Sequence, residues 1–512
     1  MSTSFEINRP PQLDGPSAAR SQYRALLGTV ASKDWKLLIG GQLTAARSGN
    51  RYPTENPATE DVIAEVPDAG AEDVDRAVAA AVTAAAEWRR IPPRERAAYI
   101  RRAAAVLLEH EHELAFLDAV DSGNPITAMR MDVQLAATTM NLYADWSMQL
   151  GGETIPLTSD HLHYTVREPY GVVARIIPYN HPILFAASRC AAPLIAGNAV
   201  VLKAPDQTPL SALRMGELLA EVFPPGVLSV ITGRGPVAGK TLVEHPAVRR
   251  IAFIGSVQTG RAIQRTAAEA GVKHVTLELG GKNPVIVFPD ADLDQATQAA
   301  VLGMNFHWTA GQSCGSTSRL LLHESIADDV IAKVKTGIEA IRVGDPLDPE
   351  TQMGALVSRE QYEKVLRYIE LGHQAGATLL CGGGRPAGLD FDRGYFVEPT
   401  VFLDVDPSSA LGQEEIFGPV LSVMRWTDER QALEIANGVP FGLTAGVWTN
   451  DLRTAHRMAT ELEAGYLWIN AASRHYWGAP YGGFKDSGVG REEGLDELLS
   501  FTQVKTVNMS IT

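Results

Sequence analysis

The sequence predicts an α/β fold built from two successive units. Between about residues 171 and 278, short apolar runs typical of strands alternate with segments of helical periodicity, and this order predicts a parallel, doubly wound sheet. A second alternation of the same kind begins at residue 284. The chain has 512 residues, which is more than one hydrophobic core normally supports, so we expect two or three domains.

The segment before the first unit is expected to contain an arm, a short strand and two helices. Residues 1–34 are interrupted by prolines and mixed charges and lack the apolar stretch of a secretory signal, so we expect a loosely ordered arm. Leu37–Ile39, followed by a Gly-Gly turn, predicts a strand. The alanine-rich stretches 73–90 and 94–109 have helical periodicity, and two prolines separate them.

The elements of the two units follow from apolar runs and helical periodicity. In the first unit we expect a strand at 172–177, a helix at 182–194, a strand at 199–203, a helix from 209, strands at 227–232 and 251–254, and a helix from 259. In the second we expect a strand at 284–288, a helix from 293, a strand at 320–323, a helix from 325, and strands at 377–381 and 396–405. The tail 500–507 reads as a strand without a core of its own, so we expect a β-arm that pairs elsewhere, for example with another subunit.

Composition and charge narrow the functional classes. The net charge is −15 and the pI is about 5.3, so the chain repels phosphate backbones and anionic lipid, and we expect neither nucleic-acid nor membrane-surface binding. Residues 171–203 form the most apolar segment, but charged and polar residues interrupt it too often for a bilayer span. Three scattered cysteines predict a reducing compartment, the cytoplasm, and none has zinc-site spacing, so no metal is expected.

A cysteine among small residues is the first candidate for a nucleophile. Cys314 lies in the segment 311–316, Gly-Gln-Ser-Cys-Gly-Ser, where small neighbours leave room for an outside carbonyl group and a backbone N–H beside the sulfur. A covalent thiol nucleophile needs this access. A buried cysteine is more often a small hydrophobic residue, so the segment by itself leaves catalysis and plain packing both open.

Three glycine-rich turns are candidate phosphate sites. Residues 233–239 resemble the dinucleotide fingerprint but have one residue too many before the third glycine, so we expect a structural turn. Residues 382–388 predict a loop, because a proline breaks the pattern. Gly255 and Ser256 follow a strand and begin a helix, whose free N-terminal amide groups suit a pyrophosphate, although such a turn is also common for structural reasons.

From Tyr52 to Val507 the sequence resembles the NAD(P)-dependent aldehyde dehydrogenases of the non-acylating, hydrolytic type. Eight motifs occur in the family's order: Pro178-Tyr-Asn180-His-Pro182, Gly197-Asn-Ala-Val-Val-Leu-Lys203, Phe253-Ile-Gly255-Ser256, Leu277-Glu278-Leu-Gly-Gly-Lys-Asn283, Gly311-Gln-Ser-Cys314, Glu414-Glu415-Ile-Phe417-Gly-Pro419, Gly442-Leu443-Thr and Pro480-Tyr-Gly-Gly-Phe-Lys485-Asp-Ser-Gly488. The resemblance implies the aldehyde dehydrogenase-like α/β fold. That fold combines a Rossmann-like cofactor domain with a second α/β catalytic domain and a small β oligomerisation arm.

The same resemblance implies a mechanism. Cys314 attacks the aldehyde carbon to give a thiohemiacetal, and Asn180 together with the Cys314 backbone N–H stabilises the oxyanion. Loss of hydride to the nicotinamide leaves a thioester, which Glu278 hydrolyses by activating a water. Leucines and glycines flank Glu278, and this apolar setting predicts a raised pKa.

The cofactor residues carry over in the same way. Lys203 and Asp206 resemble the pair that meets the adenosine ribose, and Gly255-Ser256 the turn that holds the pyrophosphate. Glu415 resembles the residue that holds the nicotinamide ribose, with Phe417 beside the ring. A carboxylate at position 206 repels a 2′-phosphate and favours NAD, but Asp is shorter than the Glu usual in the family, so use of NADP stays open.

The substrate pocket departs from the family's common pattern. By motif position His181, Phe185, Trp308, His475 and Tyr481 are expected to line or flank the aldehyde tunnel, as is Trp477. So many rings predict an aromatic or otherwise bulky aldehyde, or a semialdehyde; Arg474 and the two histidines alternatively recognise a carboxylate or hydroxyl group on it. Thr309, Tyr179 and His181 replace residues more frequent in the family.

Three alternatives to this function are weighed. A thiol hydrolase using Cys314 with His307 would turn over esters without NAD, but a loop histidine beside a cysteine is usually polar lining. A CoA-acylating semialdehyde dehydrogenase has little need of a water-activating base, so Glu278 argues against it. A non-catalytic relative would not be expected to keep Cys314, Glu278 and Asn180 together.

The resemblance also implies a domain plan and an assembly. We expect an N-terminal arm at 1–34, an NAD-binding domain at 35–150 and 172–281, a catalytic domain at 282–482, and an oligomerisation arm at 151–171 and 483–512. The arm makes a homodimer or homotetramer the expected state, with a small-molecule aldehyde as the partner.

Overall fold

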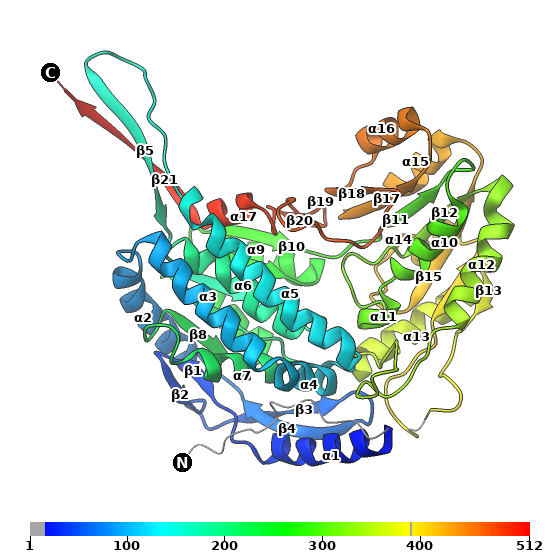
Figure 1. The fold of residues 1–512 in the computed structure, drawn as a ribbon, viewed down its shortest axis with the longest axis horizontal. Helices are drawn as coiled ribbons and strands as arrows, with labels where there is room; N and C mark the ends of the chain where they lie inside the picture. Colours follow the sequence, from blue (N-terminus) through cyan, green and yellow to red (C-terminus); the bar gives the residue numbers. More distant parts are fainter. Residues whose placement is uncertain (1–15, 390–391, 512) are drawn as a thin grey trace.

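Two α/β units lie beside each other, and a two-stranded arm projects from the first (Figure 1). The fold is taken from a computed structural model, in which residues 16–389 and 392–511 are described. The expected α/β fold class is confirmed.

The first unit is organised around one sheet. Its strands are β1 (Leu37–Ile39), β2 (Gln42–Thr44), β6 (Val172–Ile176), β7 (Ala199–Lys203), β8 (Leu228–Ile231), β9 (Val248–Ile254), β10 (His274–Glu278) and β20 (Gly488–Val489). Their order in the sheet is β2-β1-β8-β7-β6-β9-β10-β20. The run from β8 to β10 is parallel, whereas β1 and β20 pair antiparallel with β8 and β10 at its two ends. Every residue of β6, β7 and β8 is buried, as expected for parallel strands covered on both faces.

The helices of this unit are α1 (Pro16–Ser32), α2 (Ala71–Trp88), α3 (Pro93–Glu109), α4 (Glu111–Ser122), α5 (Ile126–Asp145), α6 (Pro182–Ile195), α7 (Leu210–Leu219), α8 (Lys240–Glu244), α9 (Val257–Ala270) and α17 (Leu495–Ser500), with short turns η1 (Trp146–Gln149) and η2 (Gly235–Gly239). Local sequence explains several of their ends. Pro93 occupies the first position of α3, where its missing N–H is not needed. Gly123, at φ 80°, terminates α4 in the left-handed region.

The strand order places a ligand site between β6 and β9. Along the chain the parallel strands occur as β6, β7, β8, β9 and β10, but β9 returns to the other side of β6 in the sheet. Successive strands are therefore added on one side of β6 up to β8 and on its other side from β9 onward, so the strand order reverses between β6 and β9. In sheets of this kind ligands bind outside the carboxyl ends of the strands at such a switch point.

The second unit has its own sheet. Its strands are β11 (Pro284–Val287), β12 (Arg319–His323), β13 (Thr378–Cys381), β14 (Thr400–Leu403), β15 (Val420–Trp426), β17 (Thr444–Trp448) and β18 (Tyr466–Ile469). They lie in the order β13-β14-β15-β12-β11-β17-β18, parallel except for β13. Its helices are α10 (Leu293–Leu302), α11 (Phe306–Thr309), α12 (Ala327–Glu339), α13 (Arg359–Gln374), α14 (Ala410–Gln413), α15 (Glu429–Asn437) and α16 (Leu452–Glu461), with the turn η3 (Glu324–Ile326). The strand expected at 396–405 is shorter, because residues 396–399 are irregular.

The arm is an antiparallel ribbon within one chain. β21 (Thr502–Ser510) pairs along its whole length with β5 (His161–Pro169), so the tail's first partner is its own chain. We expected residues 483–500 to belong to this ribbon as well, but they do not. β20 joins the first sheet, and α17 packs against α6. Two smaller ribbons pair β3 (Arg51–Asn56) with β4 (Asp61–Pro67), and β16 (Phe441–Gly442) with β19 (Phe484–Lys485).

The N-terminal segment is more ordered than expected. Residues 1–15 lie outside the described residues, but 16–32 form the helix α1. Tyr23 stacks on Phe116 of α4 with ring centroids 5.6 Å apart, and Val30 is fully buried. This apolar contact with the first core is a tertiary one, so the polar character of the segment gave no sign of it.

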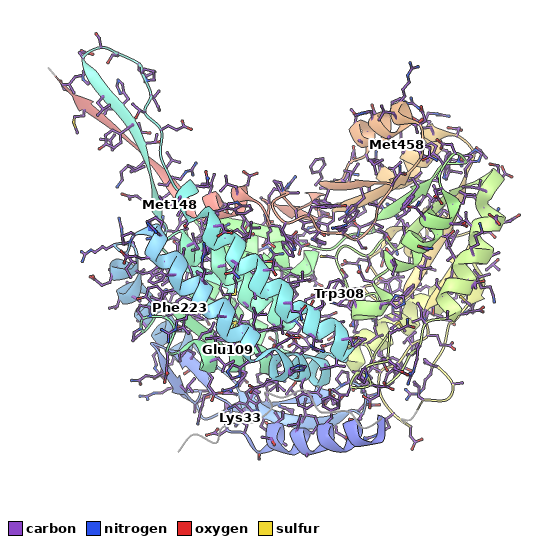
Figure 2. The ribbon with its side chains drawn as sticks, in the orientation of Figure 1. Lys33, Glu109, Met148, Phe223, Trp308 and Met458 are labelled. Carbon is purple, nitrogen blue, oxygen red and sulfur yellow. The ribbon has the colours of Figure 1, made fainter. Side chains whose placement is uncertain are left out.

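Each unit has a separate hydrophobic core. The first core runs from Tyr23 to Leu279 and is joined by Leu498 and Phe501, and the second begins at Val285. Trp308 of α11 lies where the two units meet (Figure 2). Its indole Nε1 donates to Asp132 of α5 at 2.9 Å, which ties the second unit to the first.

Candidate active site

Two cavities meet at Cys314. The first, of 540 Å³, opens at the carboxyl ends of β6 and β9, and we call it the switch-point cavity. The second, of 360 Å³, lies between α6 and the loop before β19, and we call it the ring-lined cavity. Cys314, Glu278 and Phe185 line both cavities. A molecule in either cavity therefore has access to the thiol and the carboxylate.

The Cys314 loop is held by backbone turns and one amide. Asn305, Ala310 and Gly311 have φ between 51° and 76°, so the chain reverses twice after α10. A Cβ at Gly311 would overlap the carbonyl of Gly418, which explains why this position requires glycine. Asn283 Nδ2 donates to the Cys314 carbonyl at 2.7 Å and to the Ser316 carbonyl at 2.9 Å.

Glu278 is a buried carboxyl group with an unusual pKa. It ends β10 and is 4% exposed, and its Oε1 has no hydrogen-bond partner among the described residues. Burial, followed by the charge of Glu492, raises its pKa from 4.5 to about 8. The raised pKa expected from its apolar neighbours is confirmed. Near neutral pH this carboxyl group is mostly protonated, and it can exchange a proton with a molecule bound in the cavity.

The electrostatic surroundings of Cys314 favour the thiol over the thiolate. Burial, followed by the negative charge of Glu278, raises the pKa of the Cys314 thiol well above its ordinary value. The Tyr481 hydroxyl lies 3.8 Å from Sγ and acts in the opposite direction. Burial also raises the pKa of Tyr481, so this hydroxyl keeps its proton and can donate to sulfur.

Asn180 presents an amide to the switch-point cavity. It follows β6 and is 3% exposed, and its Oδ1 has no hydrogen-bond partner among the described residues. Its backbone carbonyl accepts a hydrogen bond from Asn124 Nδ2 at 2.9 Å, which fixes the turn. The Nδ2 group of this amide is the atom that can donate to a ligand in the cavity that Cys314 shares.

One end of the switch-point cavity carries an ion pair. Lys203, at the end of β7, pairs with Asp206, and the Gly235 N–H donates to the second oxygen of Asp206 at 3.1 Å. Burial lowers the pKa of Lys203. Gly235 lines the cavity. The glycine-rich turn at 233–239, expected to be structural, therefore also forms part of the cavity wall through η2.

The middle of the cavity is a helix N-terminus. Gly255 donates its N–H to the Glu278 carbonyl at 3.1 Å, and Ser256 caps α9 by accepting from the Thr259 N–H at 3.3 Å. Gly255, Ser256 and Thr259 all line the cavity. The positive end of a fourteen-residue helix suits a pyrophosphate.

The end nearest Cys314 carries Glu415 and Phe417. Glu415 Oε1 accepts from the Gly281 N–H at 3.0 Å, and a Cβ at Gly280 would overlap the Glu415 carboxylate. Burial raises the pKa of Glu415. Phe417 packs edge-on to Tyr179 with ring centroids 5.8 Å apart. The cavity thus offers an amine and carboxylate, a helix N-terminus, and a second carboxylate near the thiol, a donor set that fits a dinucleotide.

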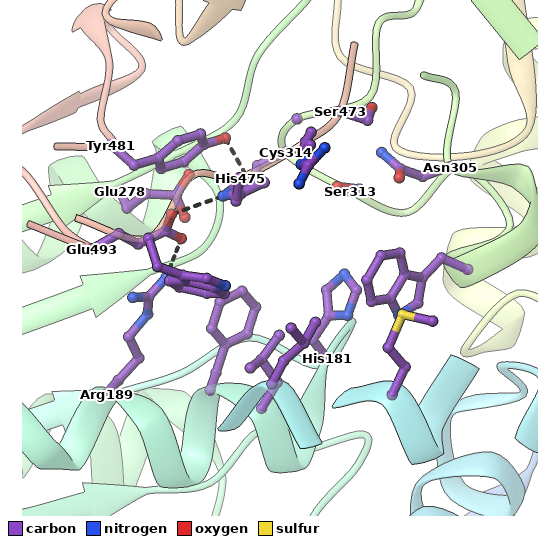
Figure 3. Close-up of a pocket in the computed structure, with 18 of the residues that line it drawn as sticks. His181, Arg189, Glu278, Asn305, Ser313, Cys314, Ser473, His475, Tyr481 and Glu493 are labelled. Atoms are coloured by element: carbon purple, nitrogen blue, oxygen red, sulfur yellow. Dashed lines mark hydrogen bonds and ion pairs between the residues drawn. The ribbon is translucent and has the colours of Figure 1, made fainter. Parts of the chain in front are cut away.

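The expected site residues divide between the two cavities. The three expected catalytic residues and the six expected cofactor residues line the switch-point cavity: Asn180, Glu278, Cys314, Lys203, Asp206, Gly255, Ser256, Glu415 and Phe417. The five expected pocket residues line the ring-lined cavity: His181, Phe185, Trp308, His475 and Tyr481 (Figure 3). Their rings form two groups. The ring centroids of His475 and Tyr481 lie 4.6 Å apart, and those of His181 and Trp308 lie 5.6 Å apart.

Two buried carboxylates behind the rings, Asp132 and Glu493, were not predicted from the sequence. Asp132 of α5 lies 2.8 Å from His181 Nδ1 and accepts from Trp308 Nε1 at 2.9 Å. Glu493 lies 2.8 Å from His475 Nδ1 and accepts from Arg189 at 3.0 Å. Burial raises the pKa of Glu493, but His475 and Arg189 outweigh it and hold this pKa at about 2. No local pattern marks Asp132 or Glu493, because their partners are distant in sequence.

A buried charge network extends from this point beneath Glu278. Arg175 pairs with Glu492 at 2.9 Å and with Glu497 at 2.8 Å, and Arg189 pairs with Glu492 at 3.2 Å. Buried charges are stable when each has a partner. The network therefore holds Glu492 close enough to influence the pKa of Glu278.

His307 and Thr309 stand apart from both cavities. His307 Nδ1 and Thr309 Oγ1 have no hydrogen-bond partner among the described residues, and neither side chain lines either cavity. Burial lowers the pKa of His307. Within the described residues Cys314 Sγ contacts the Tyr481 hydroxyl, and no interaction with His307 is found, in keeping with the expectation against a Cys–His dyad.

The part of the chain that the structure describes, residues 16–389 and 392–511, contains neither a membrane-spanning helix nor a metal-binding cluster. No helix there is long and apolar enough to cross a membrane. No group of three or more His, Cys, Asp or Glu side chains there is arranged to hold a metal ion.

Known proteins resemble the chain over nearly its full length. The model of the aldehyde dehydrogenase family matches residues 43–507. Aldehyde dehydrogenase tropH of Talaromyces stipitatus is 46% identical over 482 residues, which cover 93% of each chain. The NAD+ complex of an aldehyde dehydrogenase from Bacillus cereus is 40% identical with a TM-score of 0.92, covering 95% of this chain and 99% of its own. The P. syringae indole-3-acetaldehyde dehydrogenase AldA, solved as a mutant with NAD+ and IAA, is 37% identical with a TM-score of 0.93, covering 96% and 99%.

These matches agree with the two sheets and with a cavity suited to a dinucleotide. Identity near 40% over more than nine-tenths of both chains is far above the level at which only the fold is shared. Relatives solved with NAD+ support the same cofactor here. The chain belongs to the aldehyde dehydrogenase family and is an NAD(P)-dependent oxidoreductase that acts on aldehydes.

Proposed function

We propose that the protein oxidises an aldehyde to the carboxylic acid with Cys314 as nucleophile, Asn180 as oxyanion donor and Glu278 as general base. The observation that carries this proposal is that Cys314 and Glu278 line both cavities at once. A substrate in the ring-lined cavity and a cofactor in the switch-point cavity would then meet at the sulfur.

In the first step Cys314 sulfur bonds to the aldehyde carbon and the carbonyl electrons move to oxygen. The oxyanion of this thiohemiacetal receives hydrogen bonds from the Asn180 amide and the Cys314 backbone N–H. The thiol releases its proton to solvent before the attack, so Glu278 is required only for the later hydrolysis. Tyr481, 3.8 Å from Sγ, donates to the sulfur as its negative charge develops.

Lys203, Asp206, Gly255, Ser256, Glu415 and Phe417 would hold the cofactor along the switch-point cavity. When bound there, NAD would supply the acceptor for the hydride that leaves the substrate carbon. The Asp206 carboxylate would accept hydrogen bonds from ribose hydroxyls and repel a 2′-phosphate, which favours NAD over NADP.

In the last step Glu278 removes a proton from a water that attacks the thioester carbon. The carbon–sulfur bond breaks, the acid leaves, and Cys314 is regenerated. Burial and the Glu492 charge keep the Glu278 pKa at about 8, so its ionised form is a stronger base than an exposed carboxylate.

The rings around the second cavity support an aromatic or bulky aldehyde, or a semialdehyde, as substrate. Phe185, Trp308, Trp477 and Tyr481 line it. The P. syringae relative, an indole-3-acetaldehyde dehydrogenase, acts on an aromatic aldehyde of this kind.

The domain plan and assembly are proposed on the same basis. Residues 35–150 and 172–281 would bind NAD, and residues 282–482 would carry the catalytic loop. The β5–β21 ribbon leaves Leu162, Val504 and Met509 exposed, apolar residues that a second subunit would cover in a homodimer or homotetramer. The three cysteines are all free, which suits a reducing compartment such as the cytoplasm.

The test is NADH formation after an aromatic aldehyde is added to the purified protein with NAD. Cys314→Ala is expected to abolish NADH formation but to retain NAD binding, which is measured by the change in tryptophan fluorescence. Full activity of Cys314→Ala would contradict the proposed nucleophile. Ester hydrolysis without any NAD-dependent aldehyde oxidation would favour the thiol hydrolase instead.

A further inference from the structure

A histidine is the polar exception in one wall of the ring-lined cavity. His181 is the N-cap residue of α6, and its ring packs edge-on against those of Phe185 of α6 and Trp308 of α11, which line the cavity with it. Figure 3 shows His181 across the open space from Cys314. His475 is the second imidazole, but it lies beside Cys314 in the same view and so belongs to the reacting end.

The orientation of the His181 ring is fixed from behind. Asp132 is fully buried and lies 2.8 Å from His181 Nδ1. Because a carboxylate only accepts, Nδ1 carries the hydrogen and donates it. Asp132 also accepts from Trp308 at 2.9 Å, so one carboxylate positions two neighbouring rings of the wall.

The other edge of the imidazole has no partner in the protein. Within the part of the chain that the structure describes, no hydrogen bond reaches His181 Nε2. The His181 side chain is 12% exposed, so solvent water can reach this atom while the cavity is open. A wholly apolar substrate would displace that water and leave Nε2 without a hydrogen bond, which disfavours binding.

We propose that the substrate is an aromatic aldehyde carrying a ring hydroxyl group, and that His181 binds this hydroxyl through Nε2. The proposal rests on the proposed function and names its substrate class. A cavity of 360 Å³ is of the size that holds a single substituted ring.

A hydroxyl fits this position better than a carboxylate. It donates to a neutral imidazole and accepts from a protonated one, so it satisfies Nε2 in both states. A carboxylate pairs only with the protonated form, and it would share the cavity with the carboxyl groups of Glu278 and Glu493. Of the two arginines in the lining, Arg189 is already paired with Glu493 and Arg474 lies over the Tyr476 ring. Asp132 acts here as a positioning residue, since it touches the imidazole and not the substrate.

The experiment compares aldehydes that differ in one ring substituent. NADH formation is measured with benzaldehyde and with its hydroxy, methoxy and carboxy derivatives, each substituted at the third or the fourth ring carbon. At least one hydroxybenzaldehyde is expected to have a kcat/KM about 10- to 100-fold above that of benzaldehyde and of its methoxy analogue. Equal values, or preference for the carboxy derivative, would overturn the proposal. Absence of NADH with every aldehyde would instead overturn the proposed function.

Variants assign the preference to His181. In His181→Phe, which keeps a ring of similar size, the hydroxyl preference is expected to fall to near one, and His181→Gln should restore part of it. Asp132→Asn should raise KM for the hydroxybenzaldehyde more than it lowers kcat. His307→Phe changes a nearby histidine that lines neither cavity and should leave the preference intact. An undiminished preference in a folded, NAD-binding His181→Phe would overturn the assignment.

Discussion

Replacement of Glu278 by Gln separates the two halves of the proposed reaction. The change keeps the size of the side chain and removes its ability to take a proton from water. Hydride loss needs no base at this position, so one equivalent of NADH per active subunit should form rapidly. Turnover should then stop at the thioester, with a steady-state rate lower by about 10²- to 10⁴-fold, the usual contribution of a general base.

The pKa of Glu278 gives the expected pH dependence of the normal enzyme. With a pKa of about 8, roughly one-tenth of the carboxyl groups are ionised at pH 7. Because only the ionised form is a base, thioester hydrolysis should rise about tenfold from neutral pH and level off above the pKa. Rapid-mixing measurements of the NADH burst and the steady state resolve this step, and mass spectrometry of the quenched enzyme detects the acyl group on Cys314.

The same substitution should change stability in a defined direction. The unfolded chain releases this proton near the ordinary pKa of 4.5, whereas the folded chain holds it up to about 8. The folded state is therefore stabilised by the proton at low pH and loses that advantage as the pH rises between these two values. At pH 7 the burial penalty on Glu278 is on the order of 3 kcal/mol, so Glu278→Gln should raise Tm more at pH 7 than at about pH 5. An unchanged steady state, or hydrolysis independent of pH in this range, would refute the role of Glu278.

Three further outcomes follow from the site. Asn180→Ala removes one oxyanion donor and should lower kcat by about 10²- to 10³-fold in steady-state assays, with little change in NAD affinity; a normal kcat would remove Asn180 from the oxyanion site. Tyr481→Phe removes the group that lowers the pKa of the thiol, so alkylation of Cys314 by iodoacetamide should slow and shift to higher pH, and an unaltered profile would count against that contact. Asp206→Ser removes the carboxylate that repels a 2′-phosphate, so the ratio of kcat/KM for NADP to that for NAD should rise about tenfold; a constant ratio would place the discrimination elsewhere.

Sequence patterns were sufficient to predict most of the regular elements and to propose the reactive groups. Strands such as β6 and β7 are short apolar runs, and their periodicity is a local property that tertiary packing did not override. Cys314, Glu278 and Asn180 lie in motifs whose spacing is visible along the chain. The apolar neighbours of Glu278 also predicted the direction of its pKa change, since burial is its largest cause.

Only the tertiary structure shows which side chains distant in sequence come into contact. Asp132 positions His181 and Trp308 from a helix far from both in sequence, and Glu492 adds its charge to the burial of Glu278. The tail strand β21 was recognisable as a strand, but its pairing with β5 depends on hydrogen bonds between segments more than three hundred residues apart. The sequence by itself was enough to propose the chemistry at Cys314, because such a proposal depends on residue type. The packing of distant helices determined the shape and polarity of the cavity beside it, because no local pattern encodes which side chains will meet.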